Sequence, residues 1–188
     1  MTEPLRIVVI CKMNRCRSPI GEASFRRLAS GHEPPLFEVQ SAGIQTQVGL
    51  KPMAQAVEAA DRINLDASEI RSTPLSDSVL DWGTLFLGME RIHALEVCNR
   101  RPDLYHRTFT LKDLARRSAL FAREEPLSVQ SWLRLLSESR NRMQLIGRHA
   151  ADDIEDPTGR GMRAHRIAAK EIDTAARSIV RNCFRNRA

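Results

Sequence analysis

Five consecutive apolar residues, Ile7 to Cys11, are the starting point for the fold. The wider segment Leu5 to Ile10 is rich in apolar, β-branched residues, a pattern typical of a strand buried on both faces of a parallel sheet. The apolar run is far too short to span a bilayer. Polar residues follow it, and Ser18-Pro19 then predicts the first turn of a helix, where the missing proline N–H costs nothing. The sequence therefore begins with a predicted strand–loop–helix unit.

The same alternation continues along the chain. Further strands are predicted over Leu36–Gln40, Thr84–Met89 and Arg107–Leu111. One helix is predicted to begin at Pro52, and another contains Ile92, Leu95 and Val97. The segment Val129–Ile146 is predicted to be one helix or a pair of helices. The last helix is predicted over Met162–Phe184, and the residues expected to face inward are Ile167, Ala168, Ile172, Ala175, Ala176, Ile179 and Val180. Strands that alternate with helices indicate an α/β fold with a parallel sheet. No linker divides residues 1–188, so we expect a single domain.

Composition narrows the class of protein. The 188 residues are 42% hydrophobic and 28% charged, as in a soluble globular domain. The net charge of +6 favours an anionic substrate, but basic and acidic residues are mixed along the chain, so no specific nucleic-acid partner is expected. No signal peptide and no membrane span are predicted, and a cytoplasmic location is expected. The four cysteines have neither disulfide-scaffold nor zinc spacing, so a lone cysteine in a special setting is a candidate nucleophile.

Such a setting is the loop from Cys11 to Ser18. A buried strand delivers Cys11, and the backbone N–H groups of the next residues, together with a helix N-terminus, can surround an anion. These surroundings also favour the thiolate form of a cysteine. Arg17 follows six residues later, and its planar guanidinium can bind two phosphate oxygens at once. The loop is therefore a candidate phosphate site with its own nucleophile, although a cysteine that merely ends a core strand is the plainer alternative.

At these residues the chain resembles the low-molecular-weight protein tyrosine phosphatase family, in particular its bacterial members. The family pattern is an apolar strand followed by Cys-x-Gly-Asn-x-Cys-Arg-Ser-Pro. The matching residues are Cys11, Asn14, Cys16, Arg17, Ser18 and Pro19, then Ser41-Ala42-Gly43, then Gly49 and Pro52, and finally Asp153-Ile154-Glu155-Asp156-Pro157. The resemblance implies a three-layer fold in which helices flank a four-stranded parallel sheet of order 2-1-3-4.

The resemblance also implies roles for single residues. Cys11 would be the nucleophile, Arg17 the ligand of the phosphate, and Ser18 the group that stabilises the thiolate. Asp156 would act first as general acid and then as base. The phosphate-binding loop would comprise Lys12, Met13, Asn14, Arg15, Cys16 and Arg17, with Ser41 in support. The implied reaction passes through a phospho-cysteine and needs no metal and no organic cofactor. Its implied partners are a phosphotyrosine protein and a tyrosine kinase system, and bacterial members often oppose kinases that control polysaccharide export.

The chain departs from the family pattern at several places. Met13 replaces the loop glycine, which raises the question of backbone strain, and Thr158 stands where an aromatic residue is typical. Met13, Ile44 or Val48 are candidates for the missing wall of the pocket. Residues 116–151 are longer than the family pattern and are predicted to be a helical insertion. Cys16 is either a disulfide partner for Cys11 or a buried small side chain.

Two other functions remain open from the sequence. An arsenate reductase with this fold needs two further cysteines close together, and Cys98 and Cys183 are far apart in the chain. A non-catalytic module that binds phosphate or phosphopeptides needs Arg17 but neither Cys11 nor Asp156. The presence of both residues favours a phosphatase over either alternative.

Overall fold

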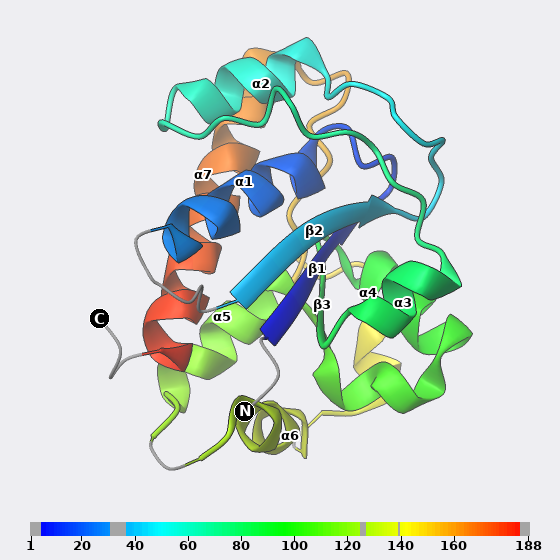
Figure 1. Ribbon diagram of the computed structural model, residues 1–188, viewed down its shortest axis with the longest axis vertical. Helices are drawn as coiled ribbons and strands as arrows, with labels where there is room; N and C mark the ends of the chain where they lie inside the picture. The colour runs from blue at the N-terminus through cyan, green and yellow to red at the C-terminus, as the bar shows by residue number, and fades with distance from the viewer. Residues whose placement is uncertain (1–4, 31–36, 125–126, 139, 185–188) are drawn as a thin grey trace.

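A four-stranded parallel sheet forms the centre of the molecule. The computed structural model describes residues 5–30, 37–124, 127–138 and 140–184. The strands are β1 (Leu5–Cys11), β2 (Phe37–Gly43), β3 (Leu85–Gly88) and β4 (Thr108–Thr110), and their order is β2-β1-β3-β4 (Figure 1). All neighbouring strands run parallel. The predicted fold class and strand order are confirmed.

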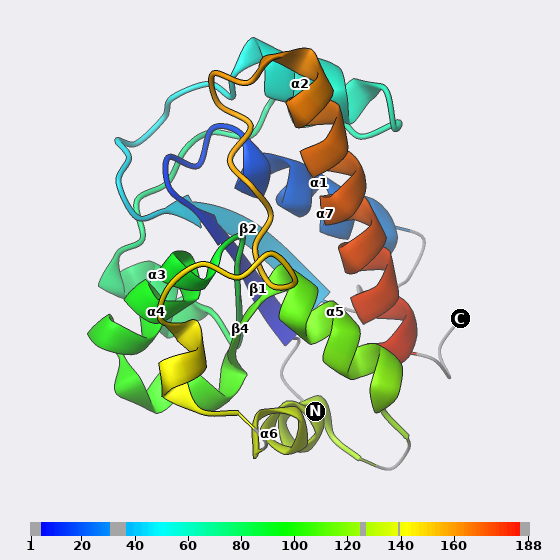
Figure 2. The ribbon, with the colours of Figure 1, turned by 180° about the vertical axis from the view of Figure 1, so that it is seen from behind.

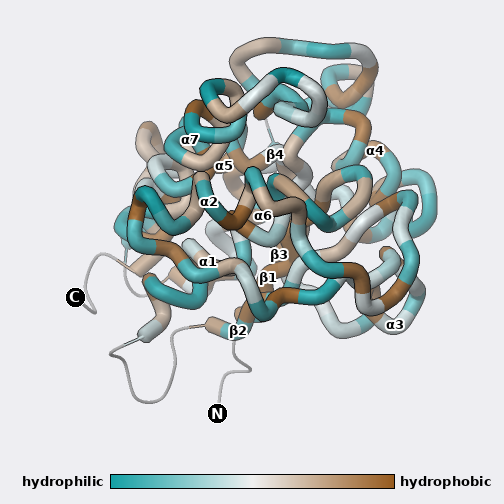
Figure 3. Tube along the Cα trace, turned by 90° about the horizontal axis from the view of Figure 1, so that it is seen from above, coloured by the Kyte–Doolittle hydropathy of each residue, from teal (hydrophilic) through white to brown (hydrophobic). Residues whose placement is uncertain are grey.

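Helices cover both faces of this sheet, so the molecule has three layers (Figures 1 and 2). One layer contains α1 (Arg17–Ala29), α2 (Ala54–Asp61), α5 (Leu111–Leu120) and α7 (Gly161–Cys183), and the other contains α3 (Asp77–Trp82) and α4 (Arg91–Arg100). Alternate residues of β1 explain the arrangement, because Ile7 and Val9 belong to the first core while Val8 and Ile10 belong to the second. The hydrophobic residues accordingly concentrate along β1 and β3 in the interior (Figure 3).

The segment 116–151 contains the end of α5, the helix α6 (Val129–Glu138) and the short 3-10 helix η2 (Arg142–Leu145). A further 3-10 helix, η1 (Pro102–Arg107), precedes β4. Trp132 of α6 is 2% exposed, and its indole N–H donates to the carbonyl of Phe121 at 2.7 Å. Arg140 donates to the carbonyls of Thr108 and Tyr105 at 2.7 and 2.9 Å. The segment therefore packs its apolar face against the domain to which it is attached.

One predicted inward position is wrong. Ile167 in α7 is 51% exposed, whereas the other positions predicted to face inward from α7 are buried or partly buried. Ile92, which the sequence placed on a helix, lies in α4 and is 58% exposed. The helical periodicity places Ile167 at the edge of the apolar stripe, next to the buried Ala168. The short helix α3 was not predicted, although Ser76 caps it by accepting from the N–H of Val79. Among the described residues, no helix combines the length and the apolarity that crossing a bilayer requires.

Candidate functional site

The loop between β1 and α1 lies at the carboxyl edge of the sheet. Cys11 is the last residue of β1 and pairs in register with Gly43, while Arg17 is the first residue of α1. Cys11, Arg17 and Ser18 are each no more than 2% exposed. Ligands bind at this edge in open α/β sheets. The structure thus brings together the residues that the sequence singled out, at the place where an α/β sheet presents its site.

The sulfur of Cys11 is the focus of two hydrogen-bond donors. The hydroxyl of Ser18 lies 3.0 Å from Sγ, and the backbone N–H of Asn14 lies 3.3 Å from it. Donors aimed at a sulfur stabilise its negatively charged form more than its neutral form. The position at the N-terminus of α1 acts in the same direction, because the first N–H groups of a helix carry partial positive charge. The loop therefore aims its donors at the Cys11 sulfur, the atom that would act as the nucleophile.

A directed chain of hydrogen bonds orients the Ser18 hydroxyl. Ser41 donates to Glu22 at 2.5 Å, so its oxygen is free to accept from the side-chain amide of Asn14 at 2.8 Å. The same amide group donates to the oxygen of Ser18 at 2.9 Å. Since Ser18 accepts from Asn14, its own hydrogen is available for the sulfur of Cys11. The predicted supporting role of Ser41 thus has a geometric basis that reaches the sulfur through two intermediate side chains.

Asn14 also fixes the backbone of the loop. It adopts φ 52°, which asparagine tolerates better than most residues. Its side-chain oxygen Oδ1 accepts from the backbone N–H of Thr73 at 2.7 Å. Gly43 allows the close approach of β2, because a Cβ there would lie 3.0 Å from the Asn14 backbone nitrogen. Met13 has no positive φ, so replacing the family glycine does not strain the backbone at this position. The Met13 side chain is 42% exposed and faces the pocket.

Arg17 is a fully buried cation with three acceptors. Its Nη1 donates to Glu90 and to the carbonyl of Ile154, both at 2.7 Å, and its Nη2 donates to Asp156 at 2.8 Å. Burial alone would lower the pKa of Arg17, but the nearby Cys11, Glu90 and Asp156 raise it above the ordinary value. Among the described residues, the buried Nε of Arg17 has no hydrogen-bond partner. The guanidinium is therefore held in place while one donor stays open.

Glu90 is a site residue that the sequence analysis missed. It is 8% exposed, forms the N-cap of α4, and its carboxylate meets Arg17. Its backbone N–H donates to Nδ1 of His93 at 3.0 Å. Burial first, and then the charge of Arg17, lower the pKa of His93 to about 3, so this ring is neutral at neutral pH. The sequence did contain a signal for Glu90. Its carboxylate comes two residues after the end of β3 at Gly88, and the carboxyl ends of parallel strands are where ligands bind.

Asp156 lies at the mouth of the site. One carboxylate oxygen contacts Arg17, and the other accepts from the backbone N–H of Thr158 at 3.1 Å. Burial would raise the pKa of Asp156, but the charge of Arg17 and the hydrogen bonds from Thr158 outweigh it and hold the pKa below the ordinary value. Without a phosphate, Asp156 is therefore a carboxylate paired with Arg17. The structure brings it to Cys11 and Arg17 from the far end of the chain.

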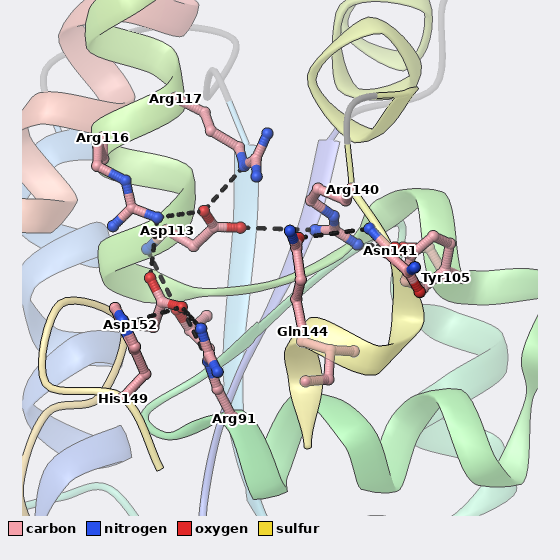
Figure 4. A pocket seen from close by; sticks show the side chains of 12 residues that line it. Arg91, Tyr105, Asp113, Arg116, Arg117, Arg140, Asn141, Gln144, His149 and Asp152 are labelled. Carbon is pink, nitrogen blue, oxygen red and sulfur yellow. Dashed lines mark hydrogen bonds and ion pairs between the residues drawn. The ribbon is translucent and has the colours of Figure 1, made fainter. Parts of the chain in front are cut away.

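The segment that carries Asp156 is fastened to the domain by a charged network (Figure 4). Asp152 accepts from Arg91 at 2.6 and 2.9 Å and from Arg116 at 2.9 Å. Asp153 accepts from the backbone N–H groups of Arg91 and His149, both at 2.8 Å. Asp152 and Asp153 are thus occupied away from Cys11, which leaves Asp156 as the carboxylate of this segment that faces the sulfur pocket.

A pocket of about 280 Å³ opens onto the sulfur. Its lining consists of Cys11, Lys12, Met13, Arg15, Cys16, Arg17, Met53, Asp156 and Thr158. None of these nine described residues is aromatic, in agreement with the threonine at position 158. Met13 and Met53 supply the apolar wall, whereas Val48 is 78% exposed and does not line the pocket. Of the three residues considered for this wall, Met13 alone takes the place.

Cys16 lies under the loop as a buried thiol. Its sulfur lies 3.4 Å from Nδ1 of His165, a histidine to which the sequence assigned no role. Burial, followed by the charges of Cys11 and Asp156, raises the pKa of Cys16 to about 12. Cys11 and Cys16 are both free thiols in this structure. In the described part of the chain, no group of three His, Cys, Asp or Glu residues is arranged to hold a metal ion.

The chain is similar to known phosphatases over most of its length. A family model described as low molecular weight phosphotyrosine protein phosphatase matches residues 6–131. A protein-arginine-phosphatase from Geobacillus stearothermophilus is 33% identical over 58% of this chain and 70% of that protein. A probable low molecular weight protein-tyrosine-phosphatase EpsP from Ralstonia nicotianae is 32% identical over 57% of this chain and 71% of that protein.

Solved structures show the same fold. The low molecular weight protein tyrosine phosphatase from T. tengcongensis superposes with a TM-score of 0.69 at 21% identity, covering 94% of this chain and 97% of that chain. The YwlE arginine phosphatase from Geobacillus stearothermophilus superposes with a TM-score of 0.67 at 25% identity, covering 94% and 90%. Together with the match to the family model over residues 6–131, these likenesses show that the chain belongs to the low molecular weight phosphotyrosine protein phosphatase family.

Proposed function

We propose that this protein hydrolyses phosphate monoesters on proteins, with phosphotyrosine as the substrate, through a phospho-cysteine at Cys11. The observation that carries the proposal is the sulfur of Cys11, which receives hydrogen bonds from Ser18 and Asn14 in a pocket that Arg17 also lines. Phosphoryl transfer needs an in-line nucleophile, donors for the equatorial oxygens and a proton for the leaving group. Cys11, the loop with Arg17, and Asp156 supply these three.

The phosphate would bind over the sulfur among the loop residues Lys12, Met13, Asn14, Arg15, Cys16 and Arg17. Their N–H groups and the helix N-terminus provide donors, and the unpaired Nε of Arg17 is a further one. A buried donor without a partner costs about 1–3 kcal/mol, which a phosphate oxygen would recover. The arriving dianion would also compete for the charge of Arg17 with Asp156.

That competition gives Asp156 its role. In the absence of phosphate, Arg17 keeps the pKa of Asp156 low. Once a phosphate dianion shares the guanidinium, the carboxylate faces added negative charge and its pKa rises, since like charges favour the neutral form. Asp156 would then donate its proton to the leaving oxygen while the sulfur of Cys11 forms its bond to phosphorus. In the second half of the reaction, the carboxylate would take a proton from the water that attacks the phospho-cysteine.

A phosphorylated arginine is the second candidate substrate. Two observations support it: a relative named a protein-arginine-phosphatase is 33% identical, and none of the described residues that line the pocket is aromatic and able to pack against a phenyl group. The carboxylate of Asp156, at 36% side-chain exposure, would be within reach of a guanidinium at the pocket mouth. If the enzyme prefers phosphotyrosine, a tyrosine kinase system is the proposed source of its substrate; a preference for phosphoarginine would remove that partner.

The test is turnover of p-nitrophenyl phosphate by the wild type and by Cys11→Ser, followed by phosphotyrosyl and phosphoarginyl forms of one peptide. Loss of turnover in Cys11→Ser with a higher kcat/KM for the phosphotyrosyl peptide supports the proposal as stated. A higher kcat/KM for the phosphoarginyl peptide would make phosphoarginine the substrate and leave the proposed catalytic site at Cys11 unchanged. Phosphate binding without any turnover by the wild type indicates the non-catalytic module. Arsenate reduction is disfavoured because Cys98 and Cys183 are both buried, in α4 and at the end of α7.

A further inference from the structure

A second hollow lies directly beside the phosphate pocket. It has a volume of about 470 Å³, within the range of ligand-binding clefts, and it shares Lys12 and Asp156 with the smaller pocket over Cys11. Three parts of the chain build its walls: the turn after β2 with Ile44, the outer face of α4, and the stretch from Leu145 to Arg148. The last stretch belongs to the segment 116–151, in which the family resemblance predicts an insertion.

The lining combines an apolar surface with cations at its rim. The apolar surface consists of Ile44, Ile92, Leu95 and Leu145. Ile92 is 58% exposed although it neighbours the buried His93, so α4 presents an aliphatic side chain to the hollow instead of to the core. An exposed aliphatic residue beside a reactive site is informative when further apolar residues surround it. The hollow is therefore suited to an aliphatic side chain.

The charges in the hollow are unevenly compensated. Its carboxylates already have partners, because Glu90 and Asp156 pair with Arg17 and Asp153 accepts two backbone N–H groups. Lys12 is exposed and has no ion pair among the described residues. The side chain of Arg148 is 85% exposed and reaches only the edge of Glu90 at 3.7 Å. The two rim cations thus favour an occupant that carries a carboxylate.

We propose that this hollow is a substrate subsite that takes a large aliphatic side chain next to the phosphorylated residue, with an acidic residue beside it facing Lys12 and Arg148. The proposal rests on the function proposed above. Because the hollow and the phosphate pocket share two wall residues, a peptide bound through its phosphate has its neighbouring residue at the entrance of the hollow. The segment from Leu145 to Arg148 would then act as a specificity element.

The test compares matched peptides on matched variants. Phosphotyrosyl peptides carry leucine or glycine at each position adjacent to the phosphorylated residue, and phosphoarginyl versions are used if those are turned over faster. The variants are Ile92→Ser, which alters the hollow, and Ile167→Ser, which changes an isoleucine of α7 that is 51% exposed and lines neither pocket. Both side chains are more than half exposed, so both variants are expected to fold.

In the wild type, we expect a kcat/KM about tenfold higher for the leucine peptide at one of the two positions, which corresponds to about 1.4 kcal/mol. This preference should fall to about twofold in Ile92→Ser and persist in Ile167→Ser. Turnover of p-nitrophenyl phosphate should be unchanged in both variants. A second pair of peptides carries glutamate or glutamine beside the leucine. The preference of the enzyme for the glutamate peptide should fall by up to about fivefold in Arg148→Gln, a small factor because exposed ion pairs are weak.

Equal rates on leucine and glycine peptides in the wild type, or a preference that survives in Ile92→Ser, overturn the subsite while p-nitrophenyl phosphate is still hydrolysed. A wild type that hydrolyses neither the small ester nor any peptide, or a Cys11→Ser variant that retains turnover, overturns the proposed function and the subsite with it. The two failures are therefore distinguishable in one set of measurements.

Discussion

Replacing Asn14 by alanine tests the hydrogen-bond network that orients the loop. Asn14 is 1% exposed, and its side chain joins three other parts of the chain: it donates to Ser18 and Ser41 and accepts from the backbone of Thr73. Asn14→Ala removes all three hydrogen bonds and leaves two buried hydroxyls and one partly buried backbone N–H without this partner. The Ser18 hydroxyl then loses the group that directs its hydrogen toward the sulfur of Cys11.

The expected cost follows from these contacts. A buried partner left without its hydrogen bond costs about 1–3 kcal/mol, so three such partners give roughly 3–6 kcal/mol after partial relaxation. Alanine at the left-handed conformation of Asn14, φ 52°, adds about 1 kcal/mol. We therefore expect Asn14→Ala to lower the free energy of unfolding by about 4–7 kcal/mol, and Asn14→Gly to be less destabilised than the alanine variant by about 1 kcal/mol.

Asn64 offers a matched control. It has φ 57°, it is exposed, and in the described part of the chain its side chain makes no hydrogen bond. Asn64→Ala therefore carries the conformational cost of about 1 kcal/mol without the network. The free energies come from urea unfolding followed by fluorescence and circular dichroism, with kcat measured for each variant that remains folded. If Asn14→Ala and Asn64→Ala are destabilised equally, the network does not hold the loop and the reasoning is refuted.

The remaining predictions concern three further titratable side chains. Asp156→Ala should lower kcat by about a hundredfold or more for esters with poor leaving groups and far less for p-nitrophenyl phosphate, and equal losses for both would remove Asp156 as the acid. Asp152→Asn should lower the free energy of unfolding by about 2 kcal/mol at pH 7 because Arg91 and Arg116 lose their partner. Since the two arginines hold the Asp152 pKa low against burial, the difference should begin to shrink as pH falls below about 4 and be lost once pH is below the lowered pKa of the folded state. A difference that does not shrink as the solution is acidified contradicts this. Burial, followed by the charge of Arg17, lowers the pKa of His93 to about 3, so protonation favours the unfolded chain below about pH 6.5. The free energy of unfolding of the wild type should therefore fall by about 2 kcal/mol between pH 7 and 5 relative to that of His93→Gln. Parallel pH profiles for the two proteins would count against a buried neutral ring.

The sequence predicted most of the fold because its strands are short apolar segments that can be recognised from local sequence alone. The apolar segment at Leu5–Ile10 marks the central strand, and the alternation of strands and helices predicts a parallel sheet. The strand order came from the family resemblance and not from the periodicity. Element ends were less predictable: β2 continues through Ser41 to Gly43, since small residues still pair with β1. The exposure of Ile167 was also missed, because helical spacing alone does not set the width of a buried stripe.

The candidate site was predictable where one short motif carries it. Cys11, Asn14, Arg17 and Ser18 lie within eight residues, so their proximity follows from local geometry. Asp156 was found through the resemblance alone, because nothing local distinguishes it from a helix cap. Glu90 was missed, since its contact with Arg17 spans 73 positions of the chain and depends on how α4 leaves the sheet.

The central claim is that the sulfur of Cys11 accepts the phosphoryl group. The direct measurement is mass spectrometry of the acid-quenched Asp156→Ala variant during turnover of p-nitrophenyl phosphate, with peptide mapping of the region around Cys11. Asp156→Ala should slow the attack of water on the intermediate, so we predict one phosphoryl group on Cys11 and none in Cys11→Ser. Turnover without any phosphorylated Cys11, or a phosphoryl group on another side chain, would contradict the account.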